Sequence, residues 1–520
     1  MANSAIKIGA ITIGGASVAA ALLFMCFGTL AAVLWRASGL ELGPADASAI
    51  RFTVLQAAVS AVVSVALAVP VARALARRQF AGRSVLITLL GAPFLVPVIV
   101  AVMGLIEVFG RTGLLNTGLV AVGLPPISIY GFHGVVLAHV FFNLPLAVRL
   151  ILQGWQAIPA ERFRLAASLA FAPADILRHL ERPMLREVLP GAALVIFTLC
   201  LSSFAVALTL GGGPRATTVE LAIYQALRFD FNLGRAAALS AIQFALCAAA
   251  VLLSMQFAKE ATFGAGFDRR ALPWWGLGCI SRLLDAISIA VAALFLILPL
   301  LMLVVHGLPG LADLPLAIWP ALGRSLFVAA LSTVLTMTAA VLLALAVVQG
   351  RFAKSLELVA MLPLAVSGLV LGTGLFLIVQ PWIAVERLTL PVTALVNATL
   401  ALPFVLRIVL PALCAIEADY GRLAASLSIT GVARWQWVIL PRLRAPLGFA
   451  AGLVAALSIG DLGVVALFAG ERGVTLPLLV QRLMGAYRMD AAASVALVLV
   501  SISFMVFWLL DWEGRRHVDA

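Results

Sequence analysis

The chain has 520 residues, of which 63% are hydrophobic and only 11% are charged. A soluble globular protein carries about 25% charged residues, so these charges cannot cover the surfaces that several soluble domains of this total length would need. The composition excludes an ordinary cytosolic enzyme and predicts an all-α, polytopic membrane protein. The 35 Lys and Arg residues against 23 Asp and Glu residues give a net charge of +12; where this excess lies along the chain decides its meaning.

Long apolar runs follow one another along the whole chain. A membrane-spanning helix needs about 20 mainly apolar residues, and the sequence offers twelve such runs. The first run follows Lys7 and is too long for the apolar part of a cleaved signal peptide, so we expect it to be a retained span. The predicted spans are residues 10–34, 52–75, 85–108, 131–153, 189–209, 236–256, 284–305, 324–347, 357–380, 392–414, 446–468 and 489–510.

The basic residues lie mainly in alternate connections between these runs. Arg73, Arg77 and Arg78 follow the second predicted span, and five arginines lie between Arg162 and Arg186 after the fourth. The opposite connections are less basic and more acidic. The positive-inside rule then places both termini in the cytoplasm and predicts a multi-pass protein. This distribution accounts for the net charge without a nucleic-acid partner.

Two parts of the chain repeat each other at a fixed spacing. Upstream, Pro93 and Gly104 match Pro363 and Gly374 at an offset of 270, so the first part has about a dozen extra residues, which we place in an outer loop at 109–130 because loops tolerate insertions. We therefore predict two homologous halves of six spans in the same orientation, as in transporters built from parallel repeats. The downstream matches are all 258 residues apart: Leu144-Pro145 with Leu402-Pro403, Arg149 with Arg407, residues 164–169 with 422–427, and Pro183 with Pro441.

The duplication also gives the predicted domain organisation. The predicted parts are a first span and outer loop at 1–49, a first transmembrane domain at 50–256, a linker and seventh span at 257–319, a second transmembrane domain at 320–512, and a cytoplasmic tail at 513–520.

The most similar parts of the two halves are residues 160–186 and 418–444, which we call the first and second repeated segments. Each is predicted to contain two helical pieces, in the first segment 161–170 and a helix that Pro173 opens, because proline is tolerated in a first helical turn. Asp175 then lies near the positive end of that helix, and Gly431 replaces Pro173 in the second segment. Repeated small residues favour a docking element over a loop that only fixes the topology.

The repeated segments resemble the E-A-A-x-x-x-G motif of ABC importer permeases, in which a proline follows the glycine after thirteen residues. Ala170 or Ser428 stands at the glycine position, and Arg164 or Arg422 at the glutamate position. The resemblance implies that both segments are coupling helices that bind two copies of a separate ABC ATPase subunit. The residues assigned to this role are Arg164, Ala166, Ala167, Ser168, Leu169, Asp175, Pro183, Arg422, Ala424, Ala425, Ser426, Leu427, Gly431 and Pro441.

The sequence lacks the features of an enzyme or an ATP-binding site. Its only lysines are Lys7, Lys259 and Lys354, and none belongs to a P-loop. The histidines and cysteines show no spacing typical of a metal site. We therefore expect no catalytic residue, no metal and no cofactor in this chain, with ATP and magnesium bound by the partner ATPase.

Residues 137–145, 211–225 and 458–468 resemble corresponding stretches of the bacterial thiamine permeases, which are fused two-half ABC importer permeases. This resemblance implies import of thiamine, or of its phosphate esters, across the bacterial inner membrane from a periplasmic binding protein. A fused ferric-iron permease shares the architecture and the repeated segments, so it stays an alternative. A secondary transporter is a further alternative, which the scarcity of acids within the spans disfavours.

One acidic residue lies near the end of an apolar span. Asp461 is flanked by Gly460 and Gly463, and acids at such positions usually face the interior of the bundle or a watery path. A carboxylate along the path suits a cationic substrate such as thiamine, whereas a helix-terminal acid bonded to a neighbouring span is the alternative. Residues 211–214 are predicted to form an outer turn, after which Arg215, Glu220 and Tyr224 are candidates for contact with the binding protein or for a gate.

Overall fold

The computed structural model describes residues 2–36, 42–90, 95–213, 216–257, 278–350, 352–383, 388–470 and 473–516. All regular elements in these ranges are helices, and 11 of them are long and apolar enough to cross a membrane, or 12 if one bent pair counts as a span. These helices confirm the predicted all-α, polytopic fold.

The helices fall into two halves of matching order. The first half contains α1 (Ala2–Leu23), η1 (Phe24–Gly28), α2 (Thr29–Arg36), α3 (Pro44–Arg77), α4 (Arg83–Leu89), α5 (Val98–Phe109), α6 (Leu114–Ala121), α7 (Phe132–Ala157), α8 (Ala160–Ser168), α9 (Pro173–Ile176), η3 (Leu177–Glu181), α10 (Arg182–Leu201), α11 (Ala205–Leu210), α12 (Val219–Arg228) and α13 (Leu233–Phe257). The second half contains α14 (Cys279–Gly307), η5 (Pro309–Leu311), α15 (Ile318–Gln349), α16 (Ala353–Met361), η6 (Leu362–Ala365), α17 (Gly368–Val379), α18 (Thr389–Ser426), α19 (Gly431–Arg434), η8 (Trp435–Ile439), α20 (Leu440–Ile459), α21 (Gly463–Phe468), α22 (Leu476–Gly485) and α23 (Met489–Arg515).

Helix positions confirm the predicted duplication. Helices α5 and α17 are related by the offset of 270 that Gly104 and Gly374 predict, whereas Pro93 lies outside the described residues. Helices α3 and α15 are related by an offset of 272, as shown by Thr53 and Ser325, which make equivalent hydrogen bonds in the two halves. The Thr53 hydroxyl accepts a hydrogen bond from the backbone N–H of Val219 (2.8 Å), and the Ser325 hydroxyl accepts one from Leu476 (2.9 Å). Each hydroxyl thereby satisfies a free amide at a helix start.

Two predicted spans are not single straight helices. In place of one span at 357–380, residues 353–365 and 368–379 form two pieces bent by 93°. The Ser367 hydroxyl accepts a hydrogen bond from the N–H of Val370 and caps the second piece. In place of one span at 85–108, α4 ends at Leu89 and α5 begins at Val98. The bent pair can still form one span, and hydropathy did not reveal its bend because it measures how apolar a segment is and not the direction of its axis. In the second case, the helix long and apolar enough to cross a membrane is Val98–Ala121.

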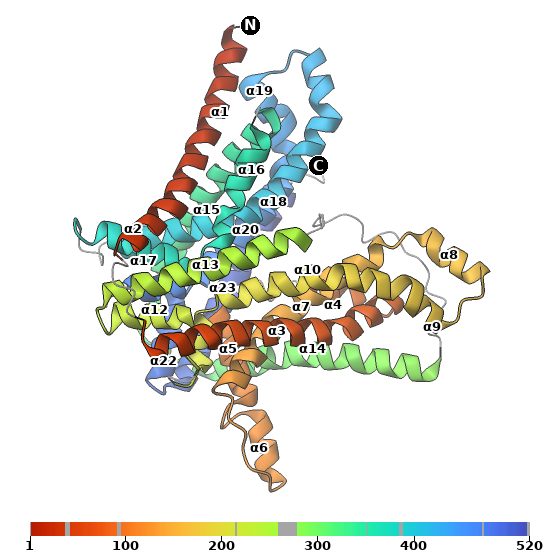
Figure 1. Cartoon of the computed structure of the whole chain (residues 1–520), viewed down its shortest axis with the longest axis vertical. Coiled ribbons are helices and arrows are strands. Elements are labelled where there is room, and N and C mark those ends of the chain that lie inside the picture. Colours follow the sequence, from red (N-terminus) through yellow and green to blue (C-terminus); the bar gives the residue numbers. More distant parts are fainter. Residues whose placement is uncertain are drawn as a thin grey trace.

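The first span of each half packs on the other half (Figure 1). Helices α1 and α2 pack on α15, α16 and α17, whereas α14 packs on α3 and α5. Each crossing brings two backbones together at a glycine. A Cβ atom on Gly104 would lie 2.5 Å from the carbonyl oxygen of Pro299 in α14, and one on Gly374 would lie 2.7 Å from the carbonyl oxygen of Thr29 in α2. Any side chain at these two positions would force the helices apart.

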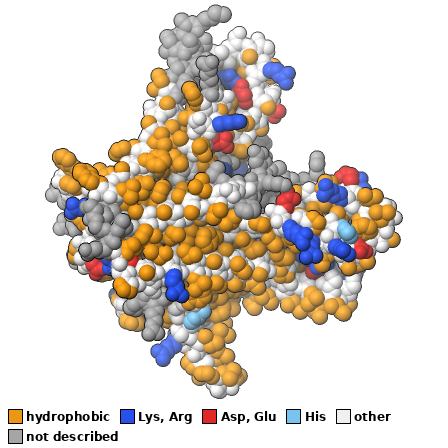
Figure 2. All heavy atoms as spheres, in the orientation of Figure 1, with side chains coloured by type: hydrophobic (Ala, Val, Ile, Leu, Met, Phe, Trp, Pro, Cys, Tyr) orange, Lys and Arg blue, Asp and Glu red, His pale blue; other side chains and the backbone are white. Residues whose placement is uncertain are grey.

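Charge is segregated on the surface of the molecule. Figure 2 shows apolar side chains over the flanks of the long helices, while Lys, Arg, Asp and Glu gather near the ends that carry α8, α9 and α19 in Figure 1. The repeated segments therefore lie at the charged ends of the two halves, on the opposite side from α6, α12 and α22.

The close approach at the two matched glycines can be tested by adding one methyl group. Gly104→Ala and Gly374→Ala are each expected to destabilise the protein by about 1–3 kcal/mol, because the new Cβ would overlap a backbone carbonyl. The measurement is the thermal unfolding of the purified full-length protein. Gly323→Ala in α15 is the control, since a Cβ there meets no atom within 4 Å; equal stability of all three variants would contradict the predicted overlap.

Candidate functional site

The two repeated segments share their backbone as well as their sequence. In the first, α8 ends at Ser168 and α9 begins at Pro173, which confirms the two predicted helical pieces. Asp175 accepts a hydrogen bond from the N–H of Ala172 (3.0 Å) and so caps α9, as its position near the helix start predicted. Each second piece continues into a π-helical turn, η3 at Leu177–Glu181 and η8 at Trp435–Ile439, again 258 residues apart.

Ala170 and Ser428 both have left-handed backbones, with φ of 53° and 54°. The N–H of Phe171 donates to the carbonyl of Ala166 (3.0 Å) and the N–H of Ala170 to that of Ala167 (3.1 Å). Ile429 and Ser428 repeat these two bonds at 2.9 and 3.1 Å. This pair of bonds is the Schellman motif that ends a helix, and its left-handed residue is usually glycine. The glycine of the importer motif thus marks a backbone conformation that this chain adopts without glycine.

The outward side of each segment is apolar at its tip. Ala166 and Ala424 are buried, whereas Ala167 and Ala425 are exposed, so the second alanine of each pair is the one open to a partner. The docking role of the segments stays a prediction. The exposed residues at matched positions are Arg164, Leu165, Ala167, Ser168 and Leu169 in the first segment and Arg422, Leu423, Ala425, Ser426 and Leu427 in the second. A pair of exposed leucines in each segment offers a small apolar surface beside a positive charge.

Gly431 and Pro173 do not substitute for each other in conformation. Gly431 has φ of 62°, which proline cannot adopt because its ring fixes φ near −65°. Pro183 and Pro441 both lie at the second position of the helix that returns to the membrane, α10 or α20. The two segments therefore enter their second helical pieces differently and leave them alike.

Each half also contains a helix break at a matched place. Helix α10 ends at Leu201 and α11 begins at Ala205, while α20 ends at Ile459 and α21 begins at Gly463, 258 residues later. The second break touches the first half: a Cβ on Gly460 would lie 3.1 Å from the Cα of Pro97, and one on Gly463 would lie 3.6 Å from Cδ1 of Phe204. Broken helices at the boundary between repeats are where transporters hold their substrates.

Asp461 lies in the second break, partly buried. Its carboxylate is beside the backbone N–H groups that begin α21 and the side-chain amide of Asn397, and its Oδ2 atom has no hydrogen-bond partner among the described residues. The first half has Ser203 at the matching position. The structure thus brings together Gly460, Asp461 and Gly463 at the boundary of the two halves, with a single acid in the pair of breaks.

An aromatic cluster that sequence reasoning did not identify adjoins this acid from the first half. The ring of Phe204 lies 5.2 Å from that of Tyr224, and Tyr224 lies 5.7 Å from Phe229. Glu220, on the same helix as Tyr224, is 1% exposed and lies beside Gln243 and Ser367. Because Glu220 is buried, its position does not support contact with a binding protein, and a role in a gate stays a prediction. Arg215 lies outside the described residues.

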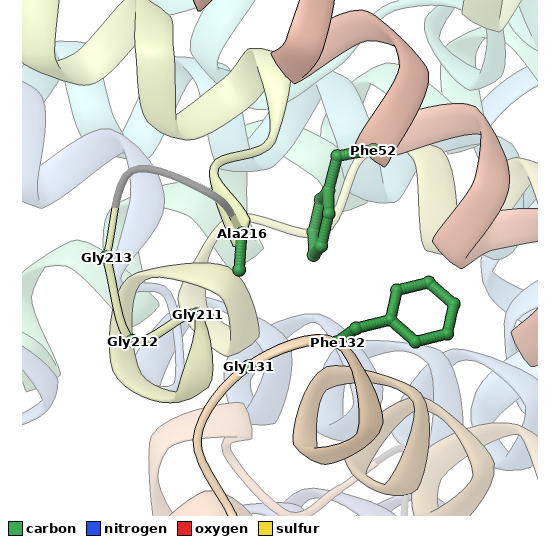
Figure 3. Close-up of a pocket in the computed structure, with 7 residues that line it drawn as sticks. All are labelled: Phe52, Gly131, Phe132, Gly211, Gly212, Gly213 and Ala216. Carbon is green, nitrogen blue, oxygen red and sulfur yellow. The ribbon is translucent and has the colours of Figure 1, made fainter.

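The glycine turn at residues 211–213 lines an apolar cavity of about 480 Å³ (Figure 3). The rings of Phe52 and Phe132 lie on its other side, with centroids 5.9 Å apart. Gly212 and Gly213 have φ of 72° and 130°, which explains the glycines. The described residues that line this cavity carry no charge and do not include Asp461.

Two homologous membrane halves, matched helix breaks at their boundary and two exposed repeated segments define a fused two-half transport permease. The chain is 40% identical to the thiamine transport system permease protein of Salmonella typhimurium over 484 residues, which cover 91% of this chain and 90% of that protein. It is 34% identical to the Haemophilus influenzae protein of the same name over 469 residues, covering 88% and 87% of the two chains. The chain therefore belongs to the family of the thiamine transport system permease proteins.

A match to a shorter permease agrees with the two-half organisation. The molybdenum transport system permease protein of Mycobacterium bovis is 31% identical over 212 residues, which cover 40% of this chain but 78% of that protein. No family model matches the chain.

Glycine substitutions at two positions of the first segment are expected to change its stability in opposite directions. Ala170→Gly is expected to stabilise the end of α8 by about 1 kcal/mol, because glycine adopts positive φ without steric cost. In this variant, hydrogen–deuterium exchange at the backbone amides of residues 170 and 171 should slow about fivefold.

Ala167→Gly is the matched control within α8, where glycine should instead cost about 1 kcal/mol and speed the same exchange. Ser428→Gly should repeat the first result in the second segment. Faster exchange at residue 171 in the Ala170→Gly protein would contradict the assigned cap.

Proposed function

We propose that the chain is the membrane-spanning subunit of an ATP-driven importer that carries thiamine, or its phosphate esters, from the periplasm to the cytoplasm. The observation that carries this proposal is the 40% identity to a thiamine transport permease over 91% of the chain. The two halves alternate between an outward-open and an inward-open arrangement. ATP and magnesium bind to the partner ATPase, and a periplasmic binding protein delivers the substrate.

The repeated segments support a role as the two sites at which ATPase subunits bind. Leu165 and Leu169 are 60% and 59% exposed, and Leu423 and Leu427 are 54% and 61% exposed. Four exposed leucines at two matched places favour two copies of one partner, since equivalent surfaces bind equivalent subunits. The internal fold of each segment, held by Ala166 or Ala424, keeps these leucines at its tip.

The charge pattern supports the orientation. The segments rich in arginine belong to the cytoplasmic face by the positive-inside rule, which puts both termini in the cytoplasm and the turn at 211–213 on the periplasmic face. This orientation places the proposed ATPase sites where ATP is available and the opposite ends of the halves where a binding protein docks, in the bacterial inner membrane.

The helix breaks support a substrate path at the boundary of the halves. Asp461 supplies a negative charge whose Oδ2 atom lacks a hydrogen-bond partner within the described ranges, and thiamine is a cation. Gly460 and Gly463 keep the boundary narrow without side chains of their own. Because the acid belongs to the second half alone, the path would contact the charge of a cation from one side.

The proposed ATPase sites can be disrupted from the outside without disturbing the segment's own core. Leu165→Asp combined with Leu423→Asp is expected to lower co-purification of the ATPase at least about tenfold, because two apolar contacts are replaced by charges. Leu124→Asp is the control, since Leu124 is also exposed (53%) but lies far from both segments. Retention of the ATPase by the double variant would contradict the assignment of these segments as its binding sites.

The substrate can be tested by uptake in a strain that lacks its own thiamine importer. The full-length chain with its ATPase and binding protein is expected to restore uptake of labelled thiamine. Asp461→Asn should then lower uptake about tenfold at equal membrane expression, because the cation loses a charge partner in a region of low dielectric.

Asp313→Asn is the matched control, since Asp313 is an exposed acid outside the helix breaks. Uptake of ferric iron in place of thiamine would support the ferric-iron alternative, and uptake without any ATPase would support a secondary transporter. Normal thiamine uptake by Asp461→Asn would leave Asp461 as the cap of α21 alone.

A further inference from the structure

The two repeated segments are joined to the preceding span in different ways. In the first half, α7 ends at Ala157, Ile158 and Pro159 are extended, and α8 begins at Ala160. In the second half, α18 runs without a break from Thr389 to Ser426. Glu417 occupies the place of Pro159, 258 residues later. The second segment is thus a continuation of its span, whereas the first is separated from its span by a break.

The apolar packing of the segments differs in the same sense. Phe163, Ala166 and Ile176 form a small core inside the first segment. In the second segment, Ile439 belongs to the large core of the second half. The first segment therefore has a core of its own, whereas the end of the second segment is part of the core of the membrane helices.

An ion pair with a buried carboxylate links the first segment to α3. The guanidinium of Arg73 in α3 lies 2.7 Å from the carboxylate of Glu181, which ends the π-helical turn and is fully buried. The matching positions in the second half are Leu345 and Ile439, and both belong to its apolar core. The attachment is ionic in one half and apolar in the other.

The second half has its own ion pair, but in another place. Arg434 binds Glu417, at the positions that Ile176 and Pro159 occupy in the first half. This pair joins the second segment to the end of α18, which is already continuous with it, and Glu417 is 40% exposed. An exposed pair of this kind contributes little, about 0–1 kcal/mol.

Two neighbouring arginines extend the connection to the other half. Arg77 and Arg78 lie 2.6 and 2.7 Å from the two carboxylate oxygens of Asp285, which is 6% exposed and lies in the second turn of the crossing helix α14. Arg78 also donates to the hydroxyl of Ser281 (3.1 Å). The end of α3 is therefore bound both to the first repeated segment and to the first span of the second half, as the adjoining ends of α3, α9 and α14 in Figure 1 illustrate.

We propose that Arg73 and Glu181 are the positioning residues that transmit movement of the first repeated segment to α3, and through Arg77, Arg78 and Asp285 to α14. Helix continuity with the preceding span is lost at Ile158 and Pro159. This pair therefore gives the segment a second link to the membrane helices, beside the continuous helix Pro173–Leu201. The second segment needs no such pair. The role of these residues in coupling rests on the proposed function, whereas their role as the attachment of the segment does not.

The attachment is tested on the purified full-length chain by hydrogen–deuterium exchange. Glu181→Gln is expected to speed exchange of the amides in 160–180 at least about tenfold, since it removes the buried carboxylate that holds the half-buried guanidinium of Arg73. Helices α3 and α10 should keep their protection. The matched control Glu417→Gln should change exchange in 418–438 by less than about fivefold.

Replacing the ion pair by the apolar residues of the second half should restore the attachment. Arg73→Leu combined with Glu181→Ile copies Leu345 and Ile439 and is expected to restore slow exchange, as is the charge-swapped pair Arg73→Glu with Glu181→Arg. Unchanged exchange in Glu181→Gln, equal loss of protection across α3 and α10, or failure of both double variants would overturn the proposed attachment.

The coupling role is tested in the assembled transporter in proteoliposomes. Glu181→Gln should lower the amount of substrate carried per ATP hydrolysed, whereas Glu417→Gln should leave this ratio unchanged. An unaltered ratio in Glu181→Gln would overturn the coupling role. If the wild-type chain showed no ATP-dependent uptake at all, the proposed function would fail, while the exchange experiment would still decide the attachment.

Discussion

The structure depends on the contact of two backbones at Gly104 and at Gly374. Inside a bilayer, helices gain nothing by hiding apolar side chains from one another, so they associate through close packing at small residues. At these glycines the first span of each half touches α5 or α17 of the other half. The two crossings hold the halves together from both sides, and they leave the boundary between the halves to the helix breaks, where Gly460 and Gly463 again permit close approach.

The sequence was sufficient to predict the features that repeat between the two halves. Apolar runs located the spans, and the fixed offsets located α5 with α17 and the two repeated segments. The sequence did not reveal the 93° bend before α17, because the apolar run continues through it. It did not reveal that α14 lies on the first half or that Arg73 meets Glu181, because such contacts join residues far apart in the chain. Asp461 was recognisable as an acid in an apolar run, and Tyr224 as a candidate beside the glycine turn, but their sequence positions did not reveal that Tyr224 packs on Phe204 at the first helix break.

The departures from the importer motif have a physical explanation. The motif glycine corresponds to a left-handed residue, and the hydrogen bonds around Ala170 and Ser428 hold that conformation despite a Cβ. Ala166 and Ala424 are buried, which favours a small side chain at both positions. Arg164 and Arg422 are exposed, so the fold of the segment does not require glutamate there. The two segments therefore share a backbone conformation at Ala170 and Ser428, where their residues differ, and share exposed residues that the backbone does not require.

The two halves share one arrangement of helices but carry different residues at two places that concern the proposed transport cycle. At the helix breaks, Ser203 and Phe204 correspond to Asp461 and Leu462, so only the second half has an acid there. At the repeated segments, Pro159 and Glu181 correspond to Glu417 and Ile439. The first segment is linked to α3 by an ion pair with a buried carboxylate, whereas the second continues its preceding span. Both differences lie where the proposed cycle requires direction: the path that a cation follows and the attachment through which an ATPase moves the helices.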